Sequence, residues 1–496
     1  MNVYAASKLL KTIKKCRLSI DTDIIKLALD YAETAHKGQL RATGEPFINH
    51  SIATATTLAD MGMDESTVLA GILHDIHEDT LCTLEDIEKN FGKDVARLVE
   101  GVSKLGRVKY RGVERYIESL RKMFIAMAED IRVIMIKFAD RIHNLQTLYA
   151  HPPHKRKRIA VETLEIYAPI ANRLGMEKIK SELEDLSFQY AYPEEYAWLQ
   201  AQTVERYHEA ERHLKIIKKQ LEKELQHTNV KYLAVEGRGK NLFRLYKKVL
   251  QHNRDIGKVH DLIALRIIVE TVPQCYTVLG IIHRRWTPIK GRIKDYIAQP
   301  KPNGYQSLHT SAFCDHGEIV EFQIRTKEMH EEAEHGIAAH WRYDESDIKR
   351  VSKKLAWVEE LRKWKEDIKD NEKYLERLKI DVFQNRIFVF TPKGDVIDLP
   401  EGATPVDFAY HVHSDIGNKM TGARINGNIA SLKTILKSGD VCEIIVDKKR
   451  RGPNLDWLSF VKTNTARGHI RNSRRSILSL PSILEFAKKG RFKNKR

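Results

Sequence analysis

The hexapeptide His74-Asp75-Ile76-His77-Glu78-Asp79 places five groups that can bind a metal or move a proton within six residues. It follows the apolar run from Val68 to Leu73, a pattern that predicts a buried helix continuing into the hexapeptide. At about 3.6 residues per turn, four of these side chains share one helix face: His74, Asp75, Glu78 and Asp79. Burying charged groups is costly unless they are paired or bind a metal, so this face requires a partner.

Two further segments carry polar groups suited to the same kind of site. His50 follows a predicted turn at residues 41–46, which begins with Arg41. Farther along, a helical pattern places three polar side chains on one face at i, i+4 and i+7: Asp140, Asn144 and Thr147. These segments supply the groups that the hexapeptide lacks.

The combined set of two imidazoles and two carboxylates predicts metal chemistry. Its members are His50, His74, Asp75 and Asp140. Mixed nitrogen and oxygen donors suit Mn²⁺, Fe or Zn²⁺ better than Ca²⁺. Such a metal lowers the pKa of bound water, and Glu78 or Asp79 would take the proton. The pattern therefore favours phosphohydrolase chemistry, while ion pairs on a helix surface are the alternative that spacing alone leaves open.

A second group of charged residues lies in the middle of the chain. Cations gather near the ends of predicted strands: Arg238, Lys240, Lys248, Arg266, Arg292, Lys294, Lys301 and Arg325. This concentration predicts triphosphate substrates. Asp261 opens one strand pattern and Glu321 lies inside another, where a carboxylate is costly unless it binds Mg²⁺. Tyr305 stands beside a Gly-centred turn and is a candidate platform for base stacking. Taken singly, these features also fit a solvated basic face, a buried ion pair and a turn tyrosine.

The texture of the chain predicts the elements that position these groups. At 496 residues, the chain is long enough for about three domains. We expect five parts in this order: an all-α domain at 1–195, an α/β domain at 196–343 that opens with a charged helix, a helical linker at 344–380, a small β-rich domain at 381–447 and a basic tail at 448–496. The opening helix, residues 196–226, is either a connector that couples two domains or a spacer.

Composition narrows the function classes. The net charge of +17 is concentrated at the end: residues 448–496 hold fifteen Lys or Arg against two acids. Such a segment either binds a polyanion such as RNA or is a solvated tail. The five cysteines are scattered without a CxxC pair, which argues against a disulfide framework. With no apolar run of about 20 residues and no signal-peptide pattern, we expect a cytoplasmic protein without membrane contact.

Three segments resemble the hydrolase half of the long RelA/SpoT homologues: RATGEPFINH, AGILHDIHEDT and IRVIMIKFADRIHNLQTL. Members of that family remove pyrophosphate from the alarmones ppGpp and pppGpp. The resemblance implies that the four residues of the donor set hold Mn²⁺ and that Glu78 and Asp79 serve the attacking water. It also implies nucleotide contacts from Arg41, Asn144 and Thr147. Departures from the family pattern occur at three positions: His77, Gln146 and Asn172.

Four later segments resemble the synthetase half of the same family: GRGKNLFRLYKK, HDLIALR, GRIKDYIAQPKPNGYQSLHT and EFQIRTKEMHEEAEHGIAAHW. That half transfers the β,γ-pyrophosphate of ATP to the 3′-hydroxyl of GDP or GTP. The resemblance implies that Asp261 and Glu321 hold Mg²⁺ and that Glu321 also activates the hydroxyl. It implies ten nucleotide-binding residues: Arg238, Lys240, Lys248, Arg266, Lys294, Lys301, Asn303, Tyr305, His309 and Gln323.

The resemblance also implies finer roles within this set. Arg238 and Arg266 would sandwich the adenine, Tyr305 would stack on the guanine, and His309 would help position the acceptor. The tetrapeptide at 292–295, RIKD, has the basic form that the family associates with bifunctional enzymes. Departures are Gly239, Asn241 and Arg244. Because Arg244 adds a cation near the expected ATP phosphates, we expect it to alter nucleotide affinity.

Residues 381–447 resemble a TGS domain, which has a β-grasp fold. The segments TPKGDVIDLPEGATPVDFAYHVHSDIG and GARINGNIASLKTILKSGDVCEII carry this resemblance. It implies that His413 approaches the 3′ end of uncharged tRNA, with a simple turn histidine as the alternative. The regulatory modules that follow in long family members are not found after it. The sequence is therefore either a naturally C-terminally short form or a part of a longer chain, and tRNA and the ribosome are candidate partners of the TGS domain and the tail.

These observations together favour a bifunctional enzyme that makes and degrades (p)ppGpp, with Mg²⁺ at one site and Mn²⁺ at the other. Its two sites require opposite regulation, and we expect a two-state rearrangement transmitted through residues 150–230. Two alternatives remain open. One is an enzyme with a single active site, and the other is an RNA-binding stress regulator with vestigial sites.

Overall fold

The computed structural model describes residues 3–16, 18–106, 122–342 and 386–471, apart from single positions and short gaps within these ranges. The chain forms two compact units, Met1–Lys369 and Asp370–Arg496. The predicted helical linker at 344–380 lies outside the described residues. The two units are described separately.

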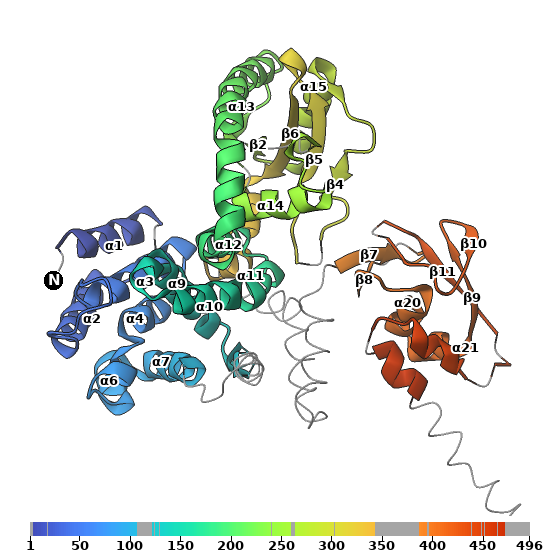
Figure 1. Ribbon diagram of the computed structural model, residues 1–496. Helices are drawn as coiled ribbons and strands as arrows, with labels where there is room; N and C mark the ends of the chain where they lie inside the picture. The colour runs from blue at the N-terminus through green and yellow to red at the C-terminus, as the bar shows by residue number, and fades with distance from the viewer. Residues whose placement is uncertain are drawn as a thin grey trace, which may run out of the picture. The chain divides into compact units, whose positions relative to one another are not determined.

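The described residues of the first part of unit 1, which we call the helical region, form helices and their connections (Figure 1). The helices are α1 (Val3–Lys15), α2 (Thr22–Ala35), α3 (Ile48–Met61), α4 (Glu65–Leu73), α5 (Ile76–Asp79), α6 (Leu84–Phe91), α7 (Lys93–Gly106), α9 (Arg132–Gln146), α10 (Pro153–Glu162), α11 (Ala168–Arg173) and α12 (Glu177–Ala191). Helix α3 packs against both α4 and α9. A Cβ at Gly71 would lie 2.4 Å from Leu58 Cδ1, so glycine allows α4 to approach α3 closely. The all-α prediction is confirmed.

The predicted continuation of the buried helix through the hexapeptide is wrong. Helix α4 ends at Leu73, His74 and Asp75 form a turn, and α5 begins at Ile76. The His74 imidazole lies beside the carbonyl of Gly71, with Nδ1 2.9 Å from the oxygen. A side chain that bonds this carbonyl competes with the helical backbone for it. The break directs His74 and Asp75 toward α3 and α9 rather than along one helix face.

A mixed sheet forms the second part of unit 1, the α/β region. Its strand order is β1-β2-β6-β5-β3, with β4 paired to β5, and β2 and β6 are parallel. The strands are β1 (Tyr232–Gly239), β2 (Ile263–Val269), β3 (Thr287–Pro288), β4 (Lys294–Asp295), β5 (Leu308–Phe313) and β6 (Ile319–Thr326). The helices are α13 (Pro193–His227), α14 (Leu242–Gln251), α15 (Val272–Arg285) and α16 (Lys327–His335).

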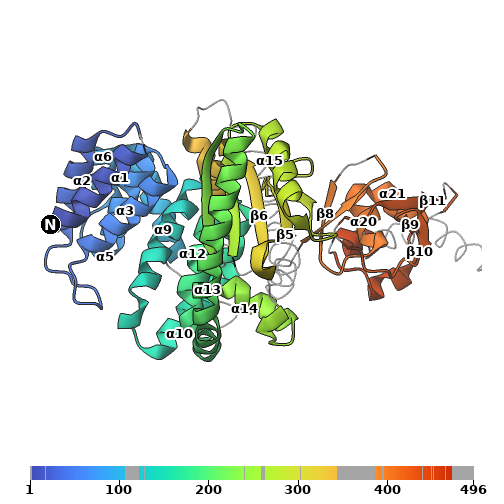
Figure 2. The ribbon, with the colours of Figure 1, turned by 90° about the horizontal axis from the view of Figure 1, so that it is seen from above.

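The charged helix predicted at 196–226 is α13, which runs along the sheet (Figures 1 and 2). Leu214, Ile217 and Leu221 of α13 are buried in the same core as the strands and α15. Burial of each such side chain contributes about 1.5–3 kcal/mol. Helix α13 is therefore part of the sheet's core and more than a spacer.

Helix α12 joins the helical region to the α/β region through contacts with α14 and α16. The Asn241 side chain donates a hydrogen bond of 2.8 Å to the carbonyl of Ser181, and the backbone N–H of Phe243 donates to Asp185. The Arg244 guanidinium contacts Glu177 and lies 3.7 Å from Glu184. Lys247 Nζ also lies 3.0 Å from Glu184. We refer to the four charged residues of this contact as the α12–α14 bridge: Glu177, Glu184, Arg244 and Lys247.

A second contact between the regions is made by backbone atoms. Gly336 has a φ of +58°, and a Cβ there would lie 2.3 Å from the carbonyl oxygen of Leu174. That carbonyl accepts a hydrogen bond of 3.1 Å from the N–H of Ile337. Asn303 Nδ2 donates to the carbonyl of Asn172 at 3.1 Å. The loop expected to meet the guanine base is therefore tied to the end of α11.

Unit 2 contains the small domain that was predicted to be β-rich, and its described residues form short strands together with helices. It contains β7 (Arg386–Phe390), β8 (Val396–Pro400), α20 (Pro405–Val412), α21 (Ser414–Lys419), β9 (Met420–Ile425), β10 (Asn428–Ala430), β11 (Cys442–Val446) and a 3₁₀ turn at Leu455–Ser459. Strands β7 and β8 pair with each other, and β9 pairs with both β10 and β11. A single bridge joins Phe390 to Val441.

The separate basic tail predicted from residue 448 begins inside this domain. Residues 449–471 fold back onto α20, and four of their side chains are buried in its core: Trp457, Val461, Ala466 and Ile470. The fully buried carboxylate of Asp407 accepts hydrogen bonds from both Thr404 and Thr463. The sequence did not indicate that these apolar side chains belong to a core, because Lys and Arg residues stand between and around them. Residues 472–496 are outside the described part.

Candidate functional site

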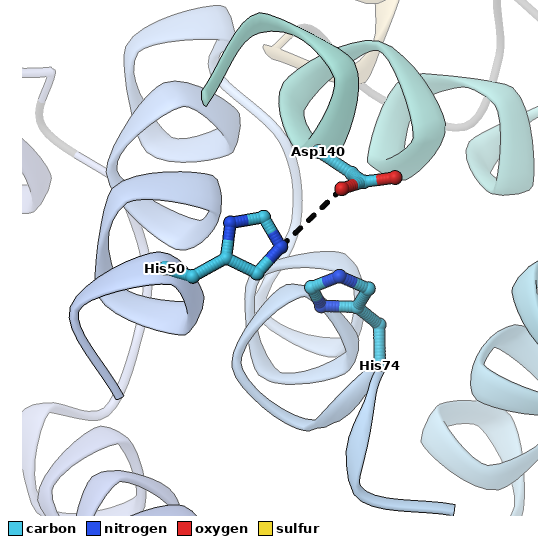
Figure 3. Close-up of side chains that lie close together, drawn as sticks. All are labelled: His50, His74 and Asp140. Atoms are coloured by element: carbon cyan, nitrogen blue, oxygen red, sulfur yellow. Dashed lines mark ion pairs between the residues drawn. The ribbon is translucent and has the colours of Figure 1, made fainter. Parts of the chain in front are cut away.

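Three buried side chains of unit 1 converge from separate helices (Figure 3). His50 comes from α3, His74 follows α4, and Asp140 comes from α9. One ligand atom from each lies within 4.8 Å of the others. His50 Nε2 is 3.3 Å from Asp140 Oδ1. These are three of the four predicted metal ligands.

Asp75 completes the predicted set. Its two oxygens lie 3.4 Å from His50 Nε2 and 3.2 Å from His74 Nε2. We refer to these four residues as the histidine–aspartate cluster: His50, His74, Asp75 and Asp140.

The cluster fits a divalent cation. The Gly71 carbonyl can only accept, so His74 Nδ1 carries the hydrogen and Nε2 presents a lone pair. This Nε2 is buried and has no hydrogen-bond partner among the described residues. In the neutral ring, Nε2 faces the carboxylate of Asp75 as one acceptor faces another, and a proton or a metal cation is the partner that satisfies both.

The electrostatics of the cluster also favour a positive ion. Burial alone would lower the pKa of His74, but Asp75 and Asp140 raise it to about 9. Without a cation the ring is therefore protonated at neutral pH, and a bound divalent ion would take the place of the proton on Nε2. Against the effect of burial, Lys137 holds the pKa of Asp140 well below its usual value. Lys137 Nζ lies 2.6 Å from one oxygen of Asp140 and leaves the other oxygen facing His50. Both carboxylates are thus available as anionic ligands.

The residues expected to contact the nucleotide lie beside this cluster. Arg41 Nη2 donates to Asn144 Oδ1 at 2.5 Å, and the Asn144 amide donates in turn to Asp140. Thr147 is one turn farther along, where its hydroxyl donates to the carbonyl of His143 at 3.0 Å. The structure therefore brings Arg41 and Asn144 to the cluster, while Thr147 bonds to its own helix.

The two expected proton acceptors are exposed on α5. Glu78 and Asp79 follow Asp75 by three and four positions, and Asp79 is close enough to interact electrostatically with Asp75, His74 and His50. Burial and the neighbouring Asp75 raise the pKa of Asp79. A carboxylate with a raised pKa is the better proton acceptor near neutral pH.

One neighbour of the cluster, His143, was not anticipated from the sequence. Its Nδ1 lies 2.8 Å from Nδ1 of His50 and 3.5 Å from Nη1 of Arg41. Burial, His50 and Arg41 lower the pKa of His143 to about 3. The signal available in the sequence was its spacing, because His143 follows Asp140 by three positions on α9.

A row of predicted nucleotide-binding residues crosses the sheet of the α/β region. In register, Arg266 of β2 lies opposite Gln323 of β6, Gln323 opposite His309 of β5, and His309 opposite Lys294 of β4. Glu321 precedes Gln323 by two positions and so points to the same face. The sheet thus gathers onto one face residues that lie up to about sixty positions apart in the chain.

Glu321 is held within this row by His309, which is itself hydrogen-bonded to Tyr305. His309 Nδ1 lies 2.8 Å from Glu321 Oε1, and His309 Nε2 lies 2.7 Å from the hydroxyl of Tyr305. Lys301 Nζ lies 4.8 Å from the centre of the Tyr305 ring and 4.6 Å from that of Tyr296. Burial, aided by neighbouring cations, lowers the pKa of Lys301 to about 8. Lys301 therefore covers one face of the tyrosine that is expected to stack on guanine.

Arg266 lines a cavity of about 320 Å³ between the sheet and α12. Its side chain is buried and lies 3.0 Å from Glu334. Helix α12 supplies half of the wall: Lys178, Ser181, Glu182 and Asp185. Burial raises the pKa of Asp185 to about 6. This contribution of α12 to the predicted adenine pocket was not anticipated from the sequence.

For several predicted residues of this second site, the structure gives little or no side-chain geometry. Asp261 and Lys240 lie outside the described residues, and only the backbone of Arg238 is described, opposite Ala264. Lys248 lies on α14, partly buried. Arg244, expected near the ATP phosphates, instead contacts the glutamates of α12, because its helix packs there.

In unit 2, His413 is exposed and begins α21. Its Nδ1 accepts a hydrogen bond of 3.2 Å from the N–H of Asp415. This local role matches the turn histidine that was the alternative, and the tRNA contact stays a prediction. None of the described helices is long and apolar enough to span a membrane.

Comparisons with known proteins agree with this arrangement. Three family models match: HD domain at residues 28–177, region found in RelA / SpoT proteins at 237–348, and TGS domain at 387–446. A GTP pyrophosphokinase of Myxococcus xanthus is 47% identical over 466 residues, which cover 93% of this chain and 61% of the relative. The bifunctional (p)ppGpp synthase/hydrolase SpoT of Escherichia coli is 45% identical over 444 residues, which cover 89% of this chain and 63% of that protein.

The chain thus spans about three fifths of the length of these relatives. Among solved structures, the small alarmone synthetase 1 of Bacillus subtilis bound to pppGpp is 22% identical and covers 34% of this chain and 98% of its own, with a TM-score of 0.25. A score this low supports no conclusion. The three matching domains and the similarity over nearly the whole chain show that it belongs to the long RelA/SpoT-type proteins.

Proposed function

We propose that the chain makes and degrades the alarmones ppGpp and pppGpp at two separate sites. One site transfers pyrophosphate from ATP to the 3′-hydroxyl of GDP or GTP, and the other hydrolyses the resulting 3′-pyrophosphate. The observation that carries the proposal is that one chain holds both a cation-seeking histidine–aspartate cluster and a sheet face on which Glu321 is oriented by His309. The relatives' names, pyrophosphokinase and synthase/hydrolase, support it.

For hydrolysis, the histidine–aspartate cluster would hold Mn²⁺. When bound, the ion supplies a water of lowered pKa. Asp79, with its raised pKa, takes the proton of that water. Arg41 is held by Asn144 next to the cluster, where its guanidinium meets the pyrophosphate. The bond between the 3′ oxygen and phosphorus breaks, and the products are GDP or GTP and pyrophosphate.

For synthesis, Glu321 and Asp261 would hold Mg²⁺, which neutralises phosphate charge when bound. Glu321 takes the proton of the 3′-hydroxyl, and His309 keeps its carboxylate in place. The hydroxyl oxygen bonds to the β-phosphorus of ATP, and AMP leaves. Lys294 pairs in register with His309, and Lys301 interacts electrostatically with Glu321; these two cations would meet the phosphates of the two nucleotides.

Two variants test whether the sites are independent. We expect Asp75→Asn to abolish breakdown of ppGpp with Mn²⁺ while leaving synthesis from ATP and GDP with Mg²⁺ intact. Glu321→Gln should have the opposite effect. Thin-layer chromatography of radiolabelled nucleotides measures both reactions on the same preparation. A wild-type protein that performs one reaction alone would support a single active site, and one that performs neither would refute the enzymatic proposal.

We further propose that α12 couples the two sites so that both are not active at once. Helix α12 contacts α9, which carries Asp140, and it also lines the cavity beside Arg266 and pairs with α14. A guanine nucleotide that binds one arrangement of these contacts more tightly shifts the population toward it. Small-angle scattering that is unchanged by guanine nucleotides, under conditions in which they switch the two activities, would contradict this coupling.

An RNA contact of unit 2 is a separate part of the proposal. The segment that follows β11 packs its apolar side chains Trp457, Val461, Ala466 and Ile470 on α20, so the basic residues interspersed among them belong to a folded segment. Uncharged tRNA and the ribosome are the partners expected for it. Filter binding of tRNA across a range of salt concentrations tests the contact, because phosphate contacts make affinity fall steeply with salt.

A further inference from the structure

We propose that His143 is a positioning residue of the hydrolase centre. It accepts a hydrogen bond from Nδ1 of His50 and thereby turns the lone pair of His50 Nε2 toward the cation. The inference rests on the proposed function, because it assumes that the histidine–aspartate cluster holds a divalent metal. It assigns a role to a residue that the sequence pattern did not single out.

The contact between the two imidazoles permits two arrangements of hydrogen atoms. The Nδ1 atoms of His50 and His143 are 2.8 Å apart, so one of them donates and the other accepts. If His143 donated, His50 would carry its own hydrogen on Nε2, between the carboxylates of Asp75 and Asp140. That arrangement would block Nε2 as a metal ligand, because a protonated ring nitrogen has no free lone pair.

Arg41 selects between the arrangements. Its Nη1 approaches the same Nδ1 of His143, at 3.5 Å. A guanidinium only donates hydrogen bonds, so the His143 nitrogen that it approaches presents a lone pair. His143 Nδ1 is therefore the acceptor, and His50 Nδ1 carries the hydrogen. His50 Nε2 is then free to bind the ion, as His74 Nε2 is through its contact with Gly71.

Both histidine ligands thus use the same device with different acceptors. For His74 the acceptor is a backbone carbonyl, and for His50 it is the side chain of His143. The side-chain acceptor lies on α9, the helix that also supplies Asp140 and Asn144. Helix α9 therefore contributes one metal ligand, the orienting partner of a second ligand, and the amide that holds Arg41.

Two substitutions of similar size separate orientation from packing. Asn places its side-chain oxygen where His143 has Nδ1, so His143→Asn keeps an acceptor, whereas His143→Leu fills the space without one. Mn²⁺ binding is measured by the electron paramagnetic resonance signal of the free ion. We expect His143→Leu to weaken Mn²⁺ binding about 10–100-fold, as is typical when a partner of a metal ligand is lost. His143→Asn should recover most of that loss.

Activity measurements give a second readout. In His143→Leu, hydrolysis of ppGpp should approach the wild-type kcat as Mn²⁺ is raised, because the ligands themselves are intact. Synthesis from ATP and GDP should be unchanged, which shows that the variant is folded. The exposed His154 on α10 provides a control, and His154→Ala should bind Mn²⁺ as the wild type does.

The outcomes are distinguishable. A wild-type chain that binds no Mn²⁺ would refute the proposed metal site itself. Wild-type binding that is unchanged in His143→Leu would refute the positioning role and leave the metal site standing. Equal losses in His143→Asn and His143→Leu would also refute it, because the acceptor would then not matter.

Discussion

The α12–α14 bridge predicts a measurable coupling between the helical region and the α/β region. The perturbations are Arg244→Ser, Glu184→Gln and the double variant. The Glu184 side chain is 4% exposed and the Arg244 side chain 31%, so this pair is more buried than a surface ion pair. Exposed pairs contribute about 0.2–1 kcal/mol, and neighbouring residues couple by about 0.5–3 kcal/mol. The burial of Glu184 favours the upper half of this second range, and Lys247, which remains beside Glu184 after Arg244 is removed, keeps the coupling below the upper limit. We therefore expect a coupling of about 2 kcal/mol.

Hydrogen exchange is the suitable assay, because a chain of several domains does not unfold in one step. A local opening that is favoured by about 2 kcal/mol exchanges about 30-fold faster, since each 1.4 kcal/mol corresponds to about tenfold. We expect each single variant to raise exchange in peptides from both α12 and α14. The double variant should exchange little faster than the more affected single variant.

A control pair and the ATP kinetics sharpen the test. Arg285 and Asp315 lie 3.1 Å apart, with 36% and 32% of their side chains exposed, and should couple by less than about 1 kcal/mol. Additive effects of Arg244→Ser and Glu184→Gln would refute the bridge. So would a KM for ATP that rises in Arg244→Ser without any change in exchange from α12, because Arg244 would then serve the phosphates, as the sequence first suggested.

Two further predictions concern Lys301 and Asp407. Burial lowers the pKa of Lys301 to about 8, so the ammonium is present below pH 8 and is lost above it; the KM for nucleotide should rise as pH increases through 8, whereas Lys301→Arg, which stays charged, should give a flat profile. An unchanged profile in the wild type would contradict this role of Lys301. In unit 2, Asp407→Asn replaces an acceptor that serves Thr404, Lys462 and Thr463; we expect this unit to lose about 2–4 kcal/mol of stability, measured by hydrogen exchange in peptides from α20, whereas the exposed Asp415→Asn should change it by less than about 0.5 kcal/mol. Equal exchange from α20 in the two variants would refute the role of Asp407.

The histidine–aspartate cluster was predictable because metal-binding residue types occur in or beside apolar segments with helical spacing. His74 and Asp75 adjoin an apolar run, and Asp140 lies in a second one. The role of His143 was not predictable in the same way. Its contact with His50 joins residues 93 positions apart and exists only because α3 packs on α9.

The second site was predictable as a set of residue types but not as a cavity. Strand patterns indicated a sheet, and the register then aligned Arg266, Gln323 and His309 in one row. Nothing in the spacing of residues 177–191 indicated that α12 would line the cavity beside Arg266, because that wall depends on long-range packing. The same packing explains why Arg244 contacts Glu177, although the sequence suggested a position near the phosphates of ATP.

The buried carboxylate of Asp407 has a consequence for how this protein can be divided. The match to the TGS family ends at residue 446, yet Asp407 draws its hydrogen bonds from Lys462 and Thr463. A cut at 446 would expose the apolar face of α20 and leave a buried negative charge without those donors. Any exchange of this module between proteins that preserves its stability must therefore carry the chain to at least residue 470. The segment that identifies the module is shorter than the segment that folds.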